Sequence, residues 1–357
     1  MQTVTKDLIT SKRVLLRLDI DVPLRQVQDK LEVVEDFRLK AGLETIKLCL
    51  NNATKIVIIG HLGRPFKTAV EEKQGSPANL SAKPVADWFE KKLQTPVEFA
   101  LTLEQAQASS AKLIVLENTR FFHGEVPGPE YHATCVSKTC DVDFAKRLAS
   151  LGEVFVNEAF ASYNKAASTT IVPTLLPHVA GIHFAKEVQV LLGVRNNPQK
   201  PFIAIMGGAK VKDKLPVINV LAKTANAVLV GGKLIAEIRE EQTILPSNVL
   251  VGKLNETGFD IAPETTVAWK SLIAKAKMIV WNGPVGKFED QAYNQTEYLA
   301  QALIESDAET ILGGGDTITA LSMYSIPIEK FTFVSTGGGA MLKLMSDGTL
   351  PTIEVLK

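Results

Sequence analysis

The sequence predicts an α/β protein made of two doubly wound parallel-sheet domains joined by a helical hinge. Its 357 residues exceed the usual size of one domain. Short apolar runs recur in both halves, and they are continuous rather than alternating, which is typical of strands buried on both faces of a parallel sheet. Segments with helical spacing separate these runs, so strand and helix alternate twice over. With 46% hydrophobic and 22% charged residues, the composition excludes the disordered, fibrous and membrane classes.

The predicted strands and helices follow in chain order. The apolar runs of the first half are VLLRL (14–18), KIVIIG (55–60), KLIVLE (112–117) and EVFVN (153–157). Those of the second half are PFIAIM (201–206), NAVLVG (226–231), NVLVG (248–252), KMIVW (277–281), TILGGG (310–315) and FTFVS (331–335). Helical spacing marks residues 40–50, 84–93, 142–151, 213–223 and 265–276. The join between the domains is expected in HFAKEVQVLLGVRNNPQKP (183–201), where a helical segment meets a polar, proline-bearing stretch.

Charge and targeting features limit the possible partners and location. Thirty-nine basic residues balance 39 acidic ones, so no global field attracts nucleic acid or a membrane surface, and any anion site must be local. The amino terminus lacks the features of a secretory signal, and a cytoplasmic location is expected. The uncharged run 166–185 contains two prolines and two histidines, which favour loop and core over a membrane span.

Three cysteines are too few for a disulfide framework and are typical of a reducing compartment. In YHATCVSKTC, His132, Cys135 and Cys140 could be three zinc ligands. No fourth ligand is identified, however, and the spacing matches no standard finger. A polar surface loop is the favoured interpretation.

Glycine follows most of the predicted strands in the second half, at the edge where open parallel sheets bind ligands. Glycine lets a ligand approach main-chain NH groups, and a helix that starts there favours phosphate. One such loop is explained by the needs of a turn, but five on one edge favour a phosphate site. Neither GxGxxG nor a Walker A pattern is present, so the site is of another type. The glycines are Gly207, Gly208, Gly231, Gly232, Gly283, Gly313, Gly314, Gly315, Gly337, Gly338 and Gly339.

Charged residues accompany these glycines. In FIAIMGGAKVKDK, a helix that begins near Lys212 would let Lys210 and Lys214 face one anion, while Lys212 faces solvent. Asp316 follows three glycines at a strand end. It could hold a magnesium ion that bridges phosphates, or cap a helix over Thr317–Met323.

The first half carries a group of charged and basic residues beside strand ends and turns. Converging arginines bind carboxylate and phosphate at two points, which would suit a small, multiply charged acid. Taken singly, each is typical of a surface ion pair. The residues are Arg17, Asp19, Asp21, Arg38, His61, Arg64 and Arg120, in RLDIDVP, EDFRLK, GHLGRP and ENTRFF.

Together these motifs resemble the phosphoglycerate kinase family, in order and over nearly the whole chain. RLDIDVPL is similar to the family's RxDxNVP, EDFRLK to DDxRI, GHLGRP to SHLGRP, VLENTRF to LLENxRF and VNEAF to VNDAF. IMGGAKVKDK, VWNGPVGKFE, GGGDT and VSTGGGA match almost letter for letter. The resemblance implies a hinge-bending kinase that transfers phosphoryl reversibly between 1,3-bisphosphoglycerate and ADP, with magnesium, and a monomer is expected. Residues 1–182 would bind phosphoglycerate and 183–342 the nucleotide, while 343–357 would pack back on the first domain.

The resemblance also implies roles on the acid side. Arg38 would neutralise the transferring group and the substrate carboxylate, and Asp19 would bond the glycerate hydroxyl. His61, Arg64 and Arg120 would hold the substrate phosphate. Asp21 and Lys165 occupy two further substrate-binding positions of the family.

On the nucleotide side, the resemblance places Lys210 at the transferring phosphoryl, Lys214 at a nucleotide phosphate and Asp316 at the metal. Gly338 and Gly339 would offer NH groups to the transition state. Thr317 would bind a phosphate and Glu289 the ribose of ATP or ADP. The remaining residues implied for the nucleotide pocket are Gly207, Gly208, Gly231, Gly232, Asn282, Pro284, Gly315 and Gly337.

The departures from the family fall mainly on the acid side. The family's NDAFGTAHRAHAS reads NEAFASYNKAAS (157–168), with Asn164 and Ala167 in place of two histidines and Lys165 in place of an arginine. Lysine keeps the charge but loses the two-point geometry. Asp21 replaces an asparagine and adds a negative charge beside an anionic substrate, so a raised Michaelis constant for phosphoglycerate is predicted.

The departures leave two alternatives open: a kinase of this fold that uses a different small acid, and a catalytically silent nucleotide-binding relative. Retention of Arg38, Lys210, Lys214 and Asp316 favours an active kinase. The insert 126–140 has no family counterpart and no predicted role.

Overall fold

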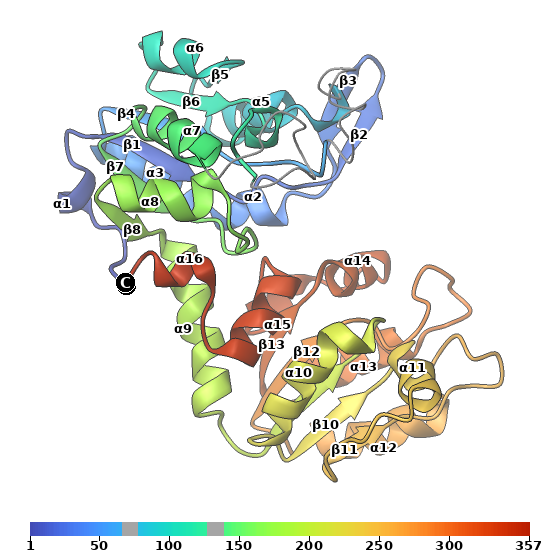
Figure 1. Cartoon of the computed structure of the whole chain (residues 1–357). Helices are drawn as coiled ribbons and strands as arrows, with labels where there is room; N and C mark the ends of the chain where they lie inside the picture. The colour runs from blue at the N-terminus through green and yellow to red at the C-terminus, as the bar shows by residue number, and fades with distance from the viewer. Residues whose placement is uncertain (66–77, 127–138) are drawn as a thin grey trace. The chain divides into compact units, whose positions relative to one another are not determined.

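The computed structural model describes residues 1–65, 78–126 and 139–357 (Figure 1). This part of the chain forms two compact units: unit 1 contains Met1–Glu187 and Leu350–Lys357, and unit 2 contains Val188–Thr349. The sequence analysis placed these boundaries after residue 182 and before residue 343. Helix α9 (Ile182–Asn196) carries the chain from unit 1 into unit 2. Of the suggested zinc ligands, His132 and Cys135 lie outside the described residues, and only the backbone of Cys140 is described.

Unit 1 is built on a parallel sheet with the strand order β5-β6-β4-β1-β7-β8. The strands predicted from long apolar runs are β1 (Arg13–Arg17), β4 (Lys55–Ile59), β6 (Leu113–Leu116) and β7 (Val154–Asn157). Two strands of this sheet were missed, β5 (Glu98–Ala100) and β8 (His178–Ala180), because each is short and begins with a polar residue, so that neither leaves a continuous apolar run. A separate antiparallel hairpin pairs β2 (Leu24–Val27) with β3 (Lys30–Val33).

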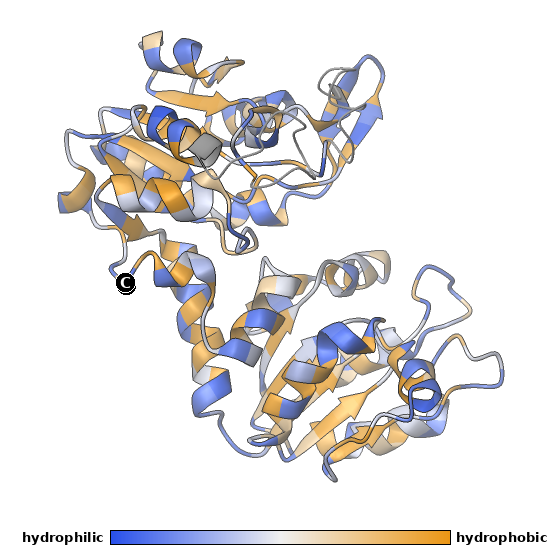
Figure 2. Ribbon diagram, in the orientation of Figure 1, coloured by the Kyte–Doolittle hydropathy of each residue, from blue (hydrophilic) through white to orange (hydrophobic). Residues whose placement is uncertain are grey.

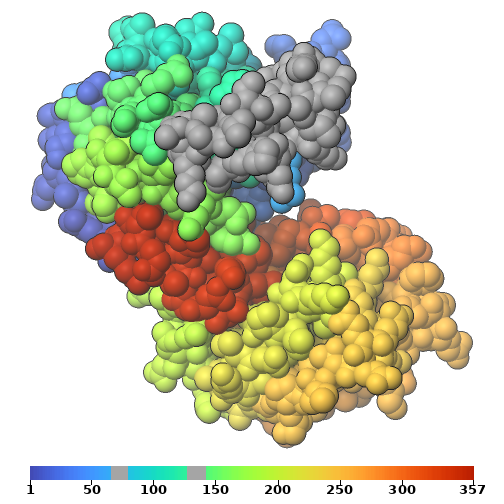
Figure 3. All heavy atoms as spheres, viewed as in Figure 1, coloured from blue at the N-terminus to red at the C-terminus, as the bar shows by residue number. Residues whose placement is uncertain are grey.

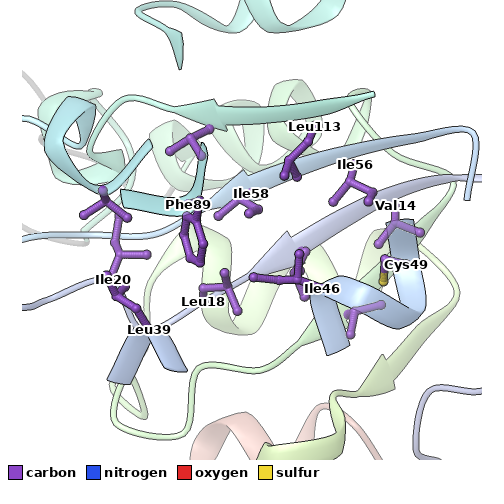
Figure 4. Packing of buried hydrophobic residues seen from close by; sticks show 14 of the residues in the cluster. Val14, Leu18, Ile20, Leu39, Ile46, Cys49, Ile56, Ile58, Phe89 and Leu113 are labelled. Atoms are coloured by element: carbon purple, nitrogen blue, oxygen red, sulfur yellow. The ribbon is translucent and has the colours of Figure 1, made fainter. Parts of the chain in front are cut away.

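Helices and short turns cover both faces of this sheet. They are α1 (Lys6–Ile9), α2 (Phe37–Ala41), α3 (Leu43–Asn52), α5 (Lys83–Leu93), α6 (Leu103–Ala108), α7 (Thr139–Ala149), α8 (Val172–Leu175), α16 (Pro351–Glu354), the 3₁₀ turns η1 (Ala78–Leu80) and η2 (Thr119–Phe121), and the π-helical turn η3 (Ala167–Ile171). Alternate residues of β1 enter two cores. Val14 belongs with Leu16 to the cluster that contains Phe89 of α5 (Figure 4), and Leu15 belongs to the cluster that contains Leu148 of α7. The apolar strands are therefore buried on both faces, as their continuous hydrophobic runs predicted.

Unit 2 repeats this architecture with the strand order β11-β10-β9-β12-β13-β14. All of its strands were predicted: β9 (Phe202–Met206), β10 (Ala227–Val230), β11 (Val249–Val251), β12 (Met278–Asn282), β13 (Glu309–Gly313) and β14 (Phe333–Val334). Its helices are α10 (Val211–Ala222), α11 (Leu234–Glu240), α12 (Pro263–Ile273), α13 (Gln295–Ile304), α14 (Gly315–Met323) and α15 (Gly338–Asp347), with the 3₁₀ turn η4 (Ile328–Lys330). The strands form a hydrophobic layer beneath more polar helix surfaces (Figure 2). The predicted fold class, two parallel-sheet α/β domains, is confirmed.

Strand register aligns the carboxyl ends of each sheet. In unit 1, Arg17 lies opposite both Ile59 and Asn157. In unit 2, Asn282 lies opposite both Met206 and Gly313. The loops that follow these strands therefore meet along one edge of each sheet, where ligands bind in open parallel folds.

The uncharged run 166–185 forms η3, α8, β8 and the start of α9, so it is core and connection as predicted. The C-terminal helix α16 contacts η3 within unit 1, where the red end of the chain meets the green segment (Figure 3). Within the described ranges, no helix is both long and apolar enough to cross a membrane.

Candidate active site

Arg17 stands at the centre of the polar edge of unit 1. It ends β1, and its side chain is almost fully buried, with 1% exposed. Nε donates to Ser168 Oγ at 3.0 Å, Nη1 to the Leu18 carbonyl at 2.6 Å, and Nη2 contacts His61 Nδ1 at 2.8 Å. The buried carboxylate of Glu125 accepts from Ser168 Oγ at 2.6 Å and compensates the charge. A buried guanidinium is stable only when it is paired and hydrogen-bonded in this way.

The contact with Arg17 determines the protonation state of His61. A guanidinium can only donate hydrogen bonds, so Nδ1 of His61 must accept and the ring proton must lie on Nε2. Burial lowers the pKa of His61 well below its usual value, and the charges of Arg17 and Arg120 lower it further. His61 is therefore a neutral side chain that can donate from Nε2 to an anion.

Asp19 is held by the NEAFASYNKAAS segment. Its Oδ2 accepts from the Ala161 amide at 2.6 Å, and its Oδ1 accepts from Ser162 Oγ at 2.5 Å. Burial raises the pKa of Asp19, and the hydrogen bond from Ser162 opposes that rise. The altered segment is thus attached directly to a predicted substrate-binding carboxylate.

Asp21 and Arg38 form a pair at the same edge. Arg38 Nη1 donates to the Asp21 carbonyl at 2.5 Å and lies 4.0 Å from its Oδ2, while the Gly63 amide donates to Oδ1 at 2.8 Å. The negative charge of Asp21 is therefore partly compensated by the arginine predicted to bind the transferring group. Arg38 would therefore have to bind a substrate anion while it remains paired with Asp21.

The other predicted acid-side residues differ in how firmly they are held. Arg120 is half-buried and donates from Nη1 to the Gly63 carbonyl. Its backbone amide donates to Asn118 Oδ1 at 3.1 Å. Arg64 and Lys165 are exposed. The structure thus contains both a fixed group of cations and an outer, solvent-facing group.

Several residues that organise this edge were not identified as site residues from the sequence. Glu117 accepts from Ser81 Oγ and from the Ala82 amide, each at 2.7 Å. Asn118 Nδ2 donates to the carbonyls of Leu62 and Leu80, which fixes the turn that carries His61. The available signal was a polar pair directly after a buried strand, but its partners are distant in the sequence.

Glu158 connects the acid edge to the helix that leaves unit 1. It follows β7 and accepts from Thr45 Oγ1 at 2.6 Å, and from the amides of His183 and Phe184 at 3.1 and 2.9 Å. These amides belong to the first turn of α9, where a carboxylate is favoured. Burial nevertheless raises the pKa of Glu158 to about 7. This cap was not predicted from the sequence.

In unit 2, α10, α14 and α15 begin at the carboxyl edge of the sheet next to glycines. A Cβ at Gly207 would collide with the Pro284 carbonyl, and a Cβ at Gly338 would collide with Gly314. The packing of neighbouring loops therefore accounts for these two glycines without a ligand. Gly315 has open space around it. Of the other predicted glycines, Gly208, Gly337 and Gly339 lie in these loops or first helical turns, and Gly231 and Gly232 lie between β10 and α11.

Asn282 gives the strongest indication of a missing ligand. It ends β12 with 4% of its surface exposed, and its Nδ2 has no hydrogen-bond partner among the described residues. The same Nδ2 would lie 3.4 Å from a Cβ at Gly314 and 3.6 Å from one at Gly338. A buried donor without a partner is costly, so an acceptor near these glycine loops is expected.

Lys214 is the buried member of the lysine loop, with 9% exposed. Its Nζ donates to the Gly207 carbonyl. Burial lowers the pKa of Lys214 to about 8, and the nearby carboxylates of Asp316 and Glu237 oppose this shift. A cation held at this cost is well suited to meet an anionic ligand.

Lys210 and Lys212 differ from this arrangement. Helix α10 begins at Val211, so Lys210 is its N-cap residue, with a φ of 66°. Lys210 and Lys214 therefore do not lie four residues apart on one helix face, as the sequence predicted. Its side chain is exposed. Lys212 is 84% exposed and lies 3.9 Å from Glu241, as expected for a solvent-facing residue.

Thr317 is buried, and its hydroxyl already has two partners. It accepts from the Gly283 amide at 2.8 Å and donates to the Gly313 carbonyl at 3.1 Å. Its backbone amide, in the first turn of α14, is therefore better placed to meet a phosphate than its hydroxyl. The Pro284 carbonyl accepts from the Gly208 amide at 2.7 Å, and Glu289 is exposed.

Asp316 is not the N-cap residue of α14, and its role at a magnesium ion stays a prediction. Helix α14 has Gly314 at its N-cap, with no side-chain cap, and Asp316 lies exposed in its first turn. Among the described residues, no group of three or more histidines, cysteines and carboxylates could hold a metal. Magnesium usually takes one or two protein carboxylates together with substrate phosphates, so a single aspartate beside a phosphate site is sufficient.

Comparison with known proteins agrees with this geometry. A family model described as phosphoglycerate kinase matches residues 4–245 and 236–348, which include both polar edges. The chain belongs to the phosphoglycerate kinase family. A phosphoglycerate kinase of Herpetosiphon aurantiacus is 33% identical, covering 99% of this chain and 98% of its own length. One of Legionella pneumophila is 34% identical, covering 98% and 95%.

Solved phosphoglycerate kinase structures have the same fold. The structure from Coxiella burnetii is similar with a TM-score of 0.76 and 28% identity, over 98% of this chain and 96% of that one. The structure from Pyrococcus horikoshii gives 0.80 over 100% and 98%, and at 24% identity it supports the fold alone.

Proposed function

We propose that this protein catalyses the reversible transfer of a phosphoryl group between ATP and the carboxylate of 3-phosphoglycerate, in glycolysis and gluconeogenesis. The products are ADP and 1,3-bisphosphoglycerate. The observation that carries the proposal is the family match, which extends over both polar edges. In this proposal the protein works as a monomer in the cytoplasm.

Unit 1 binds 3-phosphoglycerate. His61, Arg64 and Arg120 hold its phosphate, with His61 donating from Nε2 and the two arginines supplying charge. Arg38 faces the substrate carboxylate, and Asp19 accepts from the hydroxyl. The proposal is supported by the network that fixes His61 and Asp19 before any ligand arrives, because a preorganised site loses less entropy on binding.

Unit 2 binds the nucleotide. Lys214 and the first-turn amides of α14 meet its phosphates, and Glu289 meets the ribose. Asn282, whose Nδ2 has no partner in the described part of the chain, contributes a donor to the same pocket. The glycine loops around Pro284 form the remaining wall.

The reaction needs little beyond alignment and stabilisation of charge on the moving oxygens. Arg38 and Lys210 supply positive charge, and the amides of Gly338 and Gly339, at the start of α15, supply donors. Magnesium, bound by Asp316 and the nucleotide, would neutralise phosphate charge. No general base is required, because the acceptor is already a carboxylate.

Bending at α9 closes the two units on their substrates, which excludes water from the acyl phosphate. The C-terminal residues 343–357 belong to the same proposal, since they return the chain to the acid-binding domain. The contact between α16 and η3 supports this role.

A second candidate is a kinase of the same fold that accepts another small acid. It is favoured by the exposed Lys165, which stands where the family has an arginine. A lysine at this position cannot grip a phosphate at two points. An acceptor with a smaller or differently placed anionic group would depend less on two-point binding by an arginine.

A turnover assay of the purified full chain tests the proposal, with ATP, magnesium and 3-phosphoglycerate as substrates. We expect turnover that falls by at least about 100-fold in Lys210→Ala. The matched control is Lys212→Ala, an exposed lysine of the same loop, which should keep activity within about twofold. Nucleotide binding without turnover of any small acid would contradict the proposal, while turnover of a different acid alone would select the second candidate.

A further inference from the structure

Helix α10 begins without a cap from its own N-terminal residue. Lys210 occupies the N-cap position and makes no side-chain capping bond. Its φ of 66° lies in the left-handed region, which a lysine adopts only when its surroundings hold it there. The conformation of Lys210 therefore needs an explanation outside its own segment.

Glu237 of α11 supplies the missing cap. Its Oε1 accepts from the Lys210 amide at 3.0 Å, and its Oε2 accepts from the Val211 amide at 2.6 Å. A carboxylate is favoured at a helix N-terminus by the helix dipole and by the unpaired amides. Both oxygens are used, so the backbone on each side of the Lys210 α-carbon is fixed.

Helix α11 is itself attached to the lysine loop and to the core. The Leu234 amide donates to the Gly208 carbonyl at 3.2 Å. Leu234, Ile235 and Ile238 are buried, so one side of α11 packs into unit 2. Glu237 therefore acts from a rigid element.

The other helix starts at this edge are arranged differently. Gly314 and Gly337 are the N-cap residues of α14 and α15, and a glycine has no side chain with which to cap its own helix. Among the described residues, no side chain bonds the first-turn amides of these two helices, whereas the Lys210 and Val211 amides at the start of α10 are occupied by Glu237. The chain thus directs phosphate toward α14 and α15 and uses α10 to present lysines.

We propose that Glu237 is a positioning residue for phosphoryl transfer: by capping α10 it holds Lys210 in the conformation from which its ammonium reaches the transferring group. The inference rests on the proposed function, because it assigns Lys210 to that group. Glu237 also lies close enough to Lys214 to favour its charged form. Glu237 itself touches neither substrate.

Steady-state kinetics of three variants of the full chain test the proposal. Glu237→Ala removes the cap, Glu237→Gln keeps its shape and one acceptor oxygen, and Glu240→Ala makes the same charge change at an exposed position of the same helix. We expect Glu237→Ala to lower kcat at least about tenfold with the KM for ATP changed less than about threefold, since Lys210 acts on the moving group. Glu237→Gln should recover part of kcat, and Glu240→Ala should match the parent protein.

Hydrogen exchange at the amides of Lys210 and Val211 provides a readout that does not require activity. In Glu237→Ala these amides should exchange at least about fivefold faster, which is the loss expected for a helix cap. If the amides exchange faster in Glu237→Ala but the parent protein shows no turnover, the proposed function is contradicted, while the capping role of Glu237 is supported. Unchanged exchange, or a parental kcat in Glu237→Ala, would overturn the role of Glu237.

Discussion

Replacement of Lys214 by methionine should make the protein more stable and less active. Methionine has a similar volume and no charge, so it suits the buried position. The pKa of Lys214 is lowered by burial from 10.5 to about 8. A shift of this size corresponds to about 3 kcal/mol of unfavourable burial of the charged form.

The sign follows from proton linkage. Because the folded pKa lies below the unfolded value, the unfolded chain holds the proton more tightly, and stability rises with pH between about 8 and 10.5. At pH 7 the folded protein therefore bears the full free-energy cost of burying the charged form of Lys214. The variant also loses the hydrogen bond from Nζ to the Gly207 carbonyl, and this loss offsets about 1–2 kcal/mol of the stability gained by removing the buried charge. Lys214→Met should therefore gain about 1–2 kcal/mol at pH 7, and this gain should decrease toward pH 10.

Urea unfolding at pH 7 and pH 9.5, followed by tryptophan fluorescence, measures this difference. Trp269 and Trp281 are buried in unit 2 and report on it. Lys212→Met is the matched control and should change stability by less than about 0.5 kcal/mol, because its side chain is exposed. The same Lys214 variant should bind ATP at least about tenfold more weakly. A loss of stability at pH 7, or a gain that does not depend on pH, would refute the reasoning.

Three further predictions concern unit 1. The ¹⁵N spectrum of His61 should show a neutral ring with the proton on Nε2 throughout pH 5.5–8, since Arg17 donates to Nδ1; a ring that titrates within this range would contradict the assignment. Asp21→Asn should lower the KM for 3-phosphoglycerate by about three- to tenfold in steady-state assays, because it removes a negative charge beside Arg38; an unchanged or higher KM would show that Asp21 does not repel the substrate. The folded pKa of Glu158, about 7, lies above its ordinary value of 4.5, so its burial reduces stability progressively as pH rises between these values. In denaturant unfolding, the stability of Glu158→Gln relative to the parent should increase by up to about 3 kcal/mol from pH 5 to pH 8, and a constant difference would argue against this account.

The strands were predictable because parallel strands buried on both faces leave long apolar runs, as in KIVIIG and FIAIM. The short strands β5 and β8 were missed because each begins with a polar residue, Glu98 or His178, and so leaves no continuous apolar run. The network around Arg17 was also invisible. Its partner Ser168 lies 151 residues away, and a sequence shows residue types but not pairings over such a distance.

The glycine loops show a different limit on what a sequence can predict about a site. The sequence predicted small residues at the ligand edge, but it could not tell whether a ligand or a neighbouring loop fills the space, and at Gly207 and Gly338 a loop does. The division of the three lysines also required the structure. Only the fold shows that Lys210 occupies the N-cap position of α10, that Lys214 is buried, and that Glu237 reaches across from α11.

The preference among acceptors tests the central claim most directly, that the cationic edge of unit 1 holds the phosphate of 3-phosphoglycerate. The measurement is kcat/KM for 3-phosphoglycerate and for glycerate, which lacks that phosphate, with saturating ATP and magnesium. We predict that 3-phosphoglycerate is preferred by at least about 100-fold, because glycerate leaves the cations of the site unpaired. Equal values for the two acids, or turnover of neither, would contradict the account.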